Sequence, residues 1–282
     1  MYKLKSRKDI ATKIINFIKK NKKKIEIEYK NIFLLISRRN QNSVKIIIID
    51  KYKNYQNSLE GGIDLENGNA YIHNINKRAL NKKFYNKYIN NNNLIEYIKV
   101  SKGEKNKVNY TFDSKTIIIF FIDIIKLLKN VLNINYIELE DNSFIYCKGE
   151  RISSLADFGF LKNMNTWYRQ HFGFEFRNNT DKNKFKYNKI IYKNIKIKHL
   201  LKKINEYNEN NKSTCTDLLI NKIKEYNENF NIEKNKNQHI SVLFQNIKYT
   251  KKQCIFLKNN IHLIFKCLGL HHLINIKYIL YI

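Results

Sequence analysis

The sequence contains no proline, and its 282 residues include only eight glycines and four alanines. Proline and glycine usually mark turns and helix ends, so element boundaries must here be read from asparagine clusters and from changes in hydrophobic period. Lysine, asparagine, isoleucine, tyrosine and phenylalanine are abundant instead, and all five are encoded by AT-rich codons. AT-rich codon usage therefore explains this composition more directly than a function of the protein does. With 43% hydrophobic residues the chain can still bury a core, which excludes disorder of the whole chain.

Cysteine is scarce too, and its spacing excludes the common zinc motifs. No CxxC pair occurs among the four cysteines, which are Cys147, Cys215, Cys254 and Cys267. We therefore expect free thiols in a reducing compartment.

Neither end of the chain shows a targeting or membrane pattern. The first 24 residues lack the uninterrupted apolar core of a signal peptide. Residues 261–282 are largely apolar, but Lys266, His271, His272 and Lys277 interrupt them before the ~18 consecutive apolar residues that a membrane span needs. The sequence therefore predicts a soluble intracellular protein that is neither secreted nor transmembrane.

Acidic residues are few, with 24 Asp and Glu against 53 Lys and Arg, for a formal net charge of +29. This excess favours a polyanion partner, because clustered basic residues release counterions from phosphates. Only seven of the basic residues are arginine, however, so a solvated lysine coat remains the alternative interpretation. If nucleic acid binds at a specific place, we expect it where arginines cluster, at Lys148, Arg151, Lys162, Arg169 and Arg177.

Hydrophobic periods predict helices and strands in mixed order over the first half of the chain. The expected elements are a helix at 10–18, strands at 25–29, 32–36, 44–49 and 69–73, a buried helix at 116–132 and a strand at 136–139. Residues 51–68 are polar and contain the Gly61-Gly62 pair, which predicts a hairpin or a wide loop. Residues 74–115 predict one or two helices with a flexible connection, and Asp113 or Ser114 is a candidate cap for the helix that follows.

The last hundred residues are predicted to be mainly helical. Residues 199–210 and 217–230 share a pattern that is typical of a duplicated helix and cap. A further helix is expected at 250–268, with Gly269 as its stop, and a strand at 274–282. We therefore predict an α+β fold with a mixed central sheet and packed helices. Its expected parts are an N-terminal helix and strands over 1–40, an α+β domain over 41–178 and a mainly helical region over 179–282.

The segment from residue 116 to 177 resembles the second half of a GCN5-related acetyltransferase domain. Thr166-Trp167-Tyr168, followed by Phe172-Gly173-Phe174, is similar to the family's tyrosine-bearing helix and the Gly-Phe strand start after it. The chain is also similar to a group of uncharacterised proteins of large nucleocytoplasmic DNA viruses. The shared residues are Glu140-Asp141-Asn142-Ser143, Cys147, Leu161, Thr166, Trp167, Tyr168, Gly173 and Phe174, while Met164 stands where that group has glycine. This resemblance implies an acetyltransferase-like sheet and a location in the host cytoplasm or a virus factory.

The resemblance also implies a site for acetyl-CoA. Tyr168 would be the catalytic residue that protonates the departing CoA thiolate, a general-acid step. The pyrophosphate would be bound by the start of the 116–132 helix, at Ser114, Lys115, Thr116 and Ile117, although the family's glycine turn is missing there. The alternative is that Trp167 and Tyr168 simply pack their helix onto the sheet.

Other reactive residue types lack partners at a useful spacing. Ser143 and Cys147 have no histidine close in sequence, and Asp141 and Asp157 form a carboxylate pair only if the fold brings them together. His271-His272 has no acidic or cysteine partner nearby, so we expect no metal site. Two functions stay open: acyl-CoA-dependent N-acyl transfer with an altered cofactor turn, and a non-catalytic basic protein that binds nucleic acid or other viral components.

Overall fold

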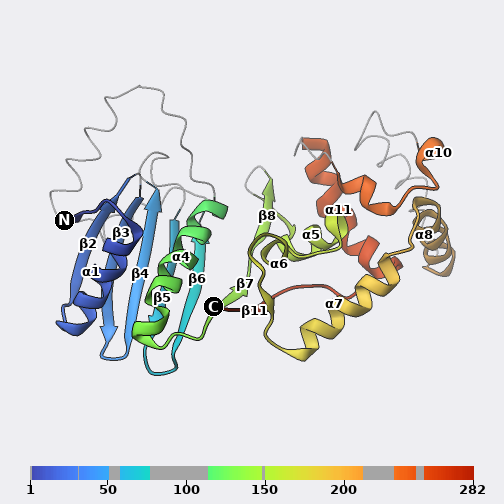
Figure 1. The fold of residues 1–282 in the computed structure, drawn as a ribbon. Helices are drawn as coiled ribbons and strands as arrows, with labels where there is room; N and C mark the ends of the chain where they lie inside the picture. Colours follow the sequence, from blue (N-terminus) through green and yellow to red (C-terminus); the bar gives the residue numbers. More distant parts are fainter. Residues whose placement is uncertain are drawn as a thin grey trace, which may run out of the picture. The chain divides into compact units, whose positions relative to one another are not determined.

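The computed structural model describes residues 2–30, 32–50, 58–76, 114–147, 150–211, 232–245 and 251–282, and these form two compact units (Figure 1). Unit 1 comprises Met1–Leu139 together with Ile279–Ile282, and unit 2 comprises Glu140–Tyr278. The predicted α+β class with a mixed sheet and packed helices is confirmed. The predicted boundaries after residues 40 and 178 stay predictions.

Unit 1 is built on a mixed sheet. Its strands are β1 (Tyr2–Lys3), β2 (Lys24–Tyr29), β3 (Ile32–Asn40), β4 (Ser43–Asp50), β5 (Ser58–Asp64), β6 (Asn69–Asn76) and β7 (Tyr136–Asp141), followed in the sheet by β11 (Ile276–Tyr281). Strands β2 to β6 pair antiparallel in chain order, whereas β1 runs parallel to β2 and β6 runs parallel to β7. The strands expected at 25–29, 32–36, 44–49, 69–73 and 136–139 are therefore confirmed.

Helices α1 (Arg7–Lys19) and α4 (Ser114–Leu132) lie across the same face of this sheet (Figure 1). Ser6 starts α1 with a reciprocal capping box to Asp9, which satisfies free N–H groups of the first turn. The two helices are joined by an ion pair between Arg7 and Asp123. Phe120 of α4 stacks on Tyr29 of β2 with ring centroids 5.7 Å apart, so α4 is anchored on the sheet by aromatic packing.

Gly61 and Gly62 lie inside strand β5, so the prediction of a hairpin or wide loop around them is wrong. The sheet needs glycine here because neighbouring backbone comes very close. A Cβ on Gly61 would lie 2.5 Å from the Tyr71 carbonyl oxygen and 3.2 Å from the Phe121 ring of α4. Glycine inside a strand often marks a place where another part of the backbone approaches closely, and Gly61 and Gly62 are at such a place.

Replacing Gly61 by alanine is expected to lower the free energy of unfolding by about 2 kcal/mol, since the new methyl group can be accommodated only by moving backbone. Chemical denaturation followed by far-ultraviolet circular dichroism measures the change. Ser43→Ala, a half-exposed position in neighbouring β4, serves as control and should change stability by less than about 0.5 kcal/mol. Equal stability of the two variants would contradict the close-packing explanation.

Unit 2 combines a hairpin with short helices. Its elements are β8 (Phe144–Cys147), β9 (Glu150–Ser154), α5 (Leu155–Asn163), α6 (Trp167–Phe172), β10 (Glu175–Phe176), α7 (Asn179–Tyr192), α8 (Ile197–Asn211), α10 (Ile232–Asn235), the 3-10 helix η1 (Ile240–Phe244), α11 (Lys251–Cys267) and the first residues of β11. An aromatic core holds the helices together: Phe160 of α5 contacts Phe185 and Tyr192 of α7, with ring centroids 5.7 and 5.3 Å apart. The helices expected near 199–210 and 250–268 and the strand near the C-terminal residue are confirmed, while residues 217–230 lie outside the described residues.

Two further predictions are tested by this region. Cys254 in α11 is disulfide-bonded, so the expectation of free thiols is wrong for this residue, whereas Cys267 is not part of a disulfide. Sequence spacing does not show which cysteines meet in space. Across the described part of the chain, every helix is too short or too polar to cross a membrane.

Candidate functional site

Tyr168 is held by a short helix with well-defined ends. Helix α6 begins at Trp167, directly after Thr166, and ends at Gly173, which has a φ of 75°. The Tyr168 ring packs against Trp167 and Tyr278, with centroids 5.0 and 5.7 Å away, and the residue is only 2% exposed. Its hydroxyl lies 3.1 Å from the Ser143 hydroxyl, so either oxygen can donate. Tyr168 is thus both part of the aromatic core and part of a polar contact.

Met164 ends the preceding helix α5 in a left-handed conformation, with a φ of 53°. Its N–H donates to the Phe160 carbonyl oxygen at 2.8 Å, as in a helix cap. Glycine adopts this conformation at the least cost. A glycine at this position would therefore have a local structural reason, and Met164 keeps the turn without it.

Asp141 lies at the end of β7 and is 4% exposed. Its Oδ1 accepts a hydrogen bond of 2.9 Å from the Ser143 N–H, which ties the carboxylate to the residue that contacts Tyr168. Burial raises the pKa of Asp141 to about 6, against the opposing effect of the Ser143 backbone and side chain, and the nearby Asp157 carboxylate raises it further. Asp141 can therefore gain or lose a proton near neutral pH.

Two buried hydroxyls complete this polar cluster of Asp141, Ser143, Thr166, Tyr168 and Tyr278. Within the described residues, Asp141 Oδ2, Thr166 Oγ1 and Tyr278 Oη are buried without a hydrogen-bond partner of good geometry. Burial is the main cause that raises the pKa of both Tyr168 and Tyr278, and the Asp141 carboxylate raises both pKa values further. The Thr166 side chain faces Tyr278 and lowers the pKa of Tyr278 in part, although the two hydroxyls do not meet full hydrogen-bond geometry. The cluster can store a proton on Asp141 and has unused hydrogen-bonding capacity.

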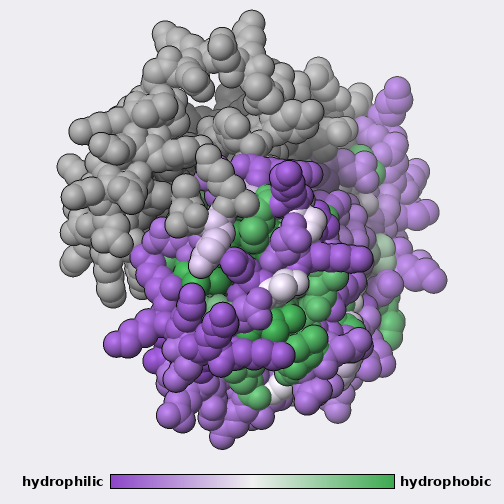
Figure 2. Space-filling view, turned by 60° about the vertical axis from the view of Figure 1, so that its left-hand side comes forward, coloured by the Kyte–Doolittle hydropathy of each residue, from purple (hydrophilic) through white to green (hydrophobic). Residues whose placement is uncertain are grey.

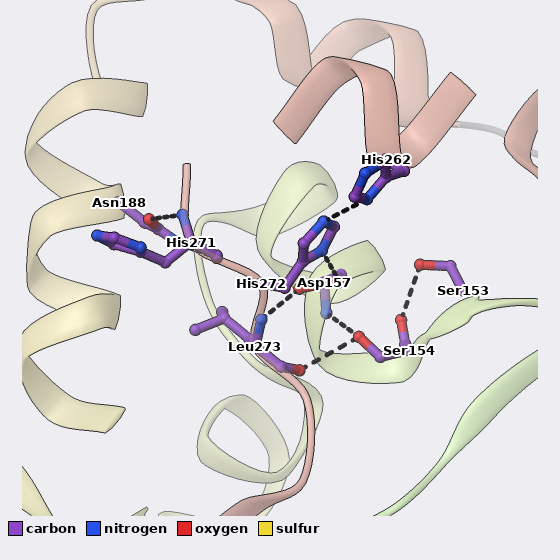
Figure 3. A network of polar contacts seen from close by, with 8 residues as sticks. All are labelled: Ser153, Ser154, Asp157, Asn188, His262, His271, His272 and Leu273. Atoms are coloured by element: carbon purple, nitrogen blue, oxygen red, sulfur yellow. Dashed lines mark hydrogen bonds and ion pairs between the residues drawn. The ribbon is translucent and has the colours of Figure 1, made fainter. Parts of the chain in front are cut away.

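A second polar network in unit 2 connects α5, α11 and the segment before β11 (Figure 3). Asp157, buried in the first turn of α5, accepts a hydrogen bond of 2.6 Å from the Leu273 N–H and lies 2.8 Å from His272 Nδ1. His272 Nε2 in turn lies 2.8 Å from Nδ1 of His262, an exposed residue of α11. This acidic partner of His272 lies 115 residues away in the sequence, so the spacing around His271-His272 does not indicate it.

The segment carrying His272 is also held from its other side. Asn188 of α7 is fully buried, and its side chain makes two hydrogen bonds with the backbone of His271, donating to the carbonyl oxygen at 2.7 Å and accepting from the N–H at 2.8 Å (Figure 3). Ser154, the N-cap of α5, donates to the Leu273 carbonyl oxygen at 3.2 Å. Residues 271–273 are therefore fixed by side chains from two helices.

The predicted cofactor-binding residues Ser114, Lys115, Thr116 and Ile117 form the first turn of α4. The Ile117 side chain is fully buried, so this residue can offer a ligand only its backbone. The turn contains no acidic side chain, and the proposed cap Asp113 lies outside the described residues. This turn belongs to unit 1, whereas Tyr168 belongs to unit 2.

The predicted nucleic-acid-binding residues have different environments. Arg169 packs over the rings of Phe176 and Phe185, at 4.9 and 4.8 Å, and lies 3.5 Å from Glu175, so it is part of the fold of unit 2. Lys162 is half-buried in the last turn of α5, and Arg177 is exposed. Arg151 lies in β9, and Lys148 lies outside the described residues.

Hydrophilic residues make up most of the coloured surface in Figure 2, with hydrophobic patches between them. Comparison with known proteins finds no relative: no family model, no curated protein and no solved structure matches the chain. Functional inference therefore rests on the residues and their geometry.

Proposed function

We propose that this chain is an acetyltransferase-like protein that binds acetyl-CoA and transfers its acetyl group to an amine. The supporting observation is the strand pair beside α4. Parallel pairing of β6 with β7 covers four residue pairs, from Asn69↔Tyr136 to Ile72↔Leu139, and β6 continues for four residues beyond it to Asn76. Strand β7 likewise continues past Leu139, to Asp141. In the family that the sequence resembles, the cofactor is accommodated where a strand splays from its neighbour beside a helix N-terminus.

In this proposal the first turn of α4 supplies backbone N–H groups to the pyrophosphate, because a helix N-terminus attracts anions even without glycine. The amine nitrogen attacks the thioester carbonyl carbon, the new C–N bond forms, and the C–S bond breaks. Tyr168 gives its proton to the leaving thiolate. The amine loses a proton as the amide forms; Asp141, whose pKa is raised, takes up this proton, and it returns to Tyr168 through Ser143.

Isothermal titration with acetyl-CoA tests the binding step, and we expect a micromolar Kd. Thr116→Glu should weaken binding at least tenfold, because a carboxylate in the first turn repels the pyrophosphate although it favours the helix dipole. Asn130→Glu places the same charge at the other end of α4 and should leave the affinity unchanged. Absence of binding at millimolar acetyl-CoA, or equal effects of the two variants, would overturn the cofactor assignment.

Tyr168→Phe tests the proton-transfer step. We expect unchanged acetyl-CoA affinity and a rate of acetyl transfer to an amine library that falls by about 10²-fold, the usual size of a general-acid contribution. Tyr187→Phe, at a position 46% exposed on α7, is the matched control and should retain the full rate. A Tyr168→Phe variant as fast as the unchanged protein would leave Tyr168 with a packing role only.

Nucleic-acid binding is the second candidate function, and helix α7 gives it a specific surface. Lys182, Lys186, Lys189 and Lys193 are all exposed, at spacings that place them on one side of the helix. Duplex DNA titrated at several salt concentrations should give a steep salt dependence, and changing these four lysines to glutamine should reduce the slope by about three to four. An unchanged slope would exclude this surface.

A further inference from the structure

Three side chains form a continuous chain of hydrogen bonds from the interior of unit 2 to its surface (Figure 3). Asp157 is 2% exposed, and each of its carboxylate oxygens has its own partner: Oδ1 accepts from the Leu273 N–H, and Oδ2 faces His272 Nδ1. The far side of the His272 ring faces His262. We call these three residues, Asp157, His272 and His262, the relay.

The two imidazole rings of the relay meet edge to edge. They are coplanar, with an interplanar angle of 0°, and their centroids are 4.9 Å apart while the facing nitrogens are 2.8 Å apart. Each nitrogen lies about 1.1 Å from the centre of its own ring, so these distances require the two rings to point almost directly at one another, as a linear N–H···N bond does. Phe265 lies parallel to the His272 ring at 4.6 Å and fixes its plane.

The Asp157 carboxylate sets the direction of the protons in the relay. An ionised carboxylate only accepts hydrogen bonds, so His272 donates through Nδ1, and in its neutral form it accepts through Nε2. With His272 neutral, His262 donates through Nδ1, which leaves the lone pair on its Nε2. Because His262 is exposed on α11, the relay places a basic and nucleophilic nitrogen at the surface.

We propose that His262 is a catalytic nucleophile that accepts acyl groups from activated esters and thioesters, with His272 and Asp157 as positioning residues. The Nε2 lone pair attacks the carbonyl carbon, a C–N bond forms, and the C–O or C–S bond breaks to release the leaving group as an anion. The Nδ1 proton moves toward His272 as the ring gains charge, and Asp157 stabilises that charge. Water then hydrolyses the acyl-imidazole to the free acid. This activity does not depend on the proposed binding of acetyl-CoA.

The surroundings of His262 favour an anionic substrate. Lys258 and Lys266 lie four residues before and after it on α11, so all three side chains share one side of the helix, and both lysines are exposed. Positive charge near the nucleophile attracts an ester that carries a phosphate or carboxylate and stabilises the oxyanion that forms during attack.

Hydrolysis of p-nitrophenyl acetate by the full chain tests the nucleophile. We expect more than one turnover per molecule, an acetyl group on His262 detected by mass spectrometry after acid quenching, and a rate at least tenfold lower in His262→Gln. His199→Gln is the matched control, since His199 is also exposed but its Nδ1 accepts from the Lys196 N–H, and it should retain the rate. Equal rates for the unchanged protein and His262→Gln would overturn the proposal.

Asp157→Asn tests the positioning residues. The Leu273 N–H requires the asparagine oxygen, so the asparagine NH₂ must face His272 Nδ1 and reverse every hydrogen bond of the relay. His262 Nε2 would then carry a proton, and the rate should fall as far as in His262→Gln at pH 7 to 8, with an unchanged circular dichroism spectrum. A folded Asp157→Asn protein with the full rate would show that the relay does not control His262, and would remove His272 and Asp157 from the proposal.

Discussion

Replacing Asp141 by asparagine is expected to stabilise the protein by about 3 kcal/mol at pH 8 and to leave its stability almost unchanged at pH 4. Burial raises the pKa of Asp141 from 3.8 to about 6 in the folded protein. The folded state therefore binds this proton more tightly than the unfolded state. The stability that results is complete below pH 3.8 and is lost as the pH rises through 6. Asparagine cannot ionise, and its oxygen can still accept the hydrogen bond from the Ser143 N–H.

Denaturant unfolding at pH 4 and pH 8, followed by fluorescence, measures this difference. Trp167 is the chain's only tryptophan and contacts Tyr168, so it reports on the surroundings of Asp141 in unit 2. Glu175→Gln removes a carboxylate that is 59% exposed in the same unit and serves as the control for the loss of a surface carboxylate. If Asp141→Asn were destabilising by the same amount at both pH values, the buried carboxylate would be needed for structure and the expected sign would be wrong.

Asn188→Leu is expected to lower the free energy of unfolding by about 3 kcal/mol. Leucine has nearly the same size, but it cannot replace the two hydrogen bonds that hold the His271 backbone, and an unpaired buried backbone group costs about 1–3 kcal/mol. Trp167 fluorescence during guanidinium unfolding again serves as the measurement. Asn183→Leu makes the same change at an exposed position of α7 and should have little effect. If both variants lost the same free energy of unfolding, the cause would be the presence of leucine in α7 and not the loss of the hydrogen bonds to His271.

Strand and helix positions could be predicted where the hydrophobic pattern is local. The β-branched run of β4 and the apolar helix α4 carry their own period, so each was found within two residues of its observed bounds. Gly61 and Gly62 were misread because a glycine pair has the same appearance in a turn and in a crowded strand. The crowding is visible only in space: Gly61 lies against the Tyr71 carbonyl oxygen and the Phe121 ring, and Gly62 lies against the Val44 carbonyl oxygen.

In the candidate sites too, local features could be predicted and contacts between distant residues could not. The sequence singled out Tyr168, and the aromatic packing that was the alternative to a catalytic role is present, together with a contact to Ser143 that was not foreseen. Asp141 and Asp157 were considered as a carboxylate pair, but their separate partners, Ser143 and His272, were not foreseen. Asp157 and His272 lie 115 residues apart, and no spacing rule connects residues that meet only because two helices and a loop pack together.

Unit 1 is discontinuous, and this has a consequence for its synthesis. Residues 279–282 supply the part of β11 that follows β7 in the sheet, yet the ribosome makes them only after all of unit 2. At translation rates of about 5–20 residues per second, the growing chain exposes the edge of β7 for on the order of 10 s. Unpaired strand edges recruit other chains during this time. Protection of β7 by a chaperone or by the emerging unit 2 would therefore decide how much of the newly made protein reaches its native sheet.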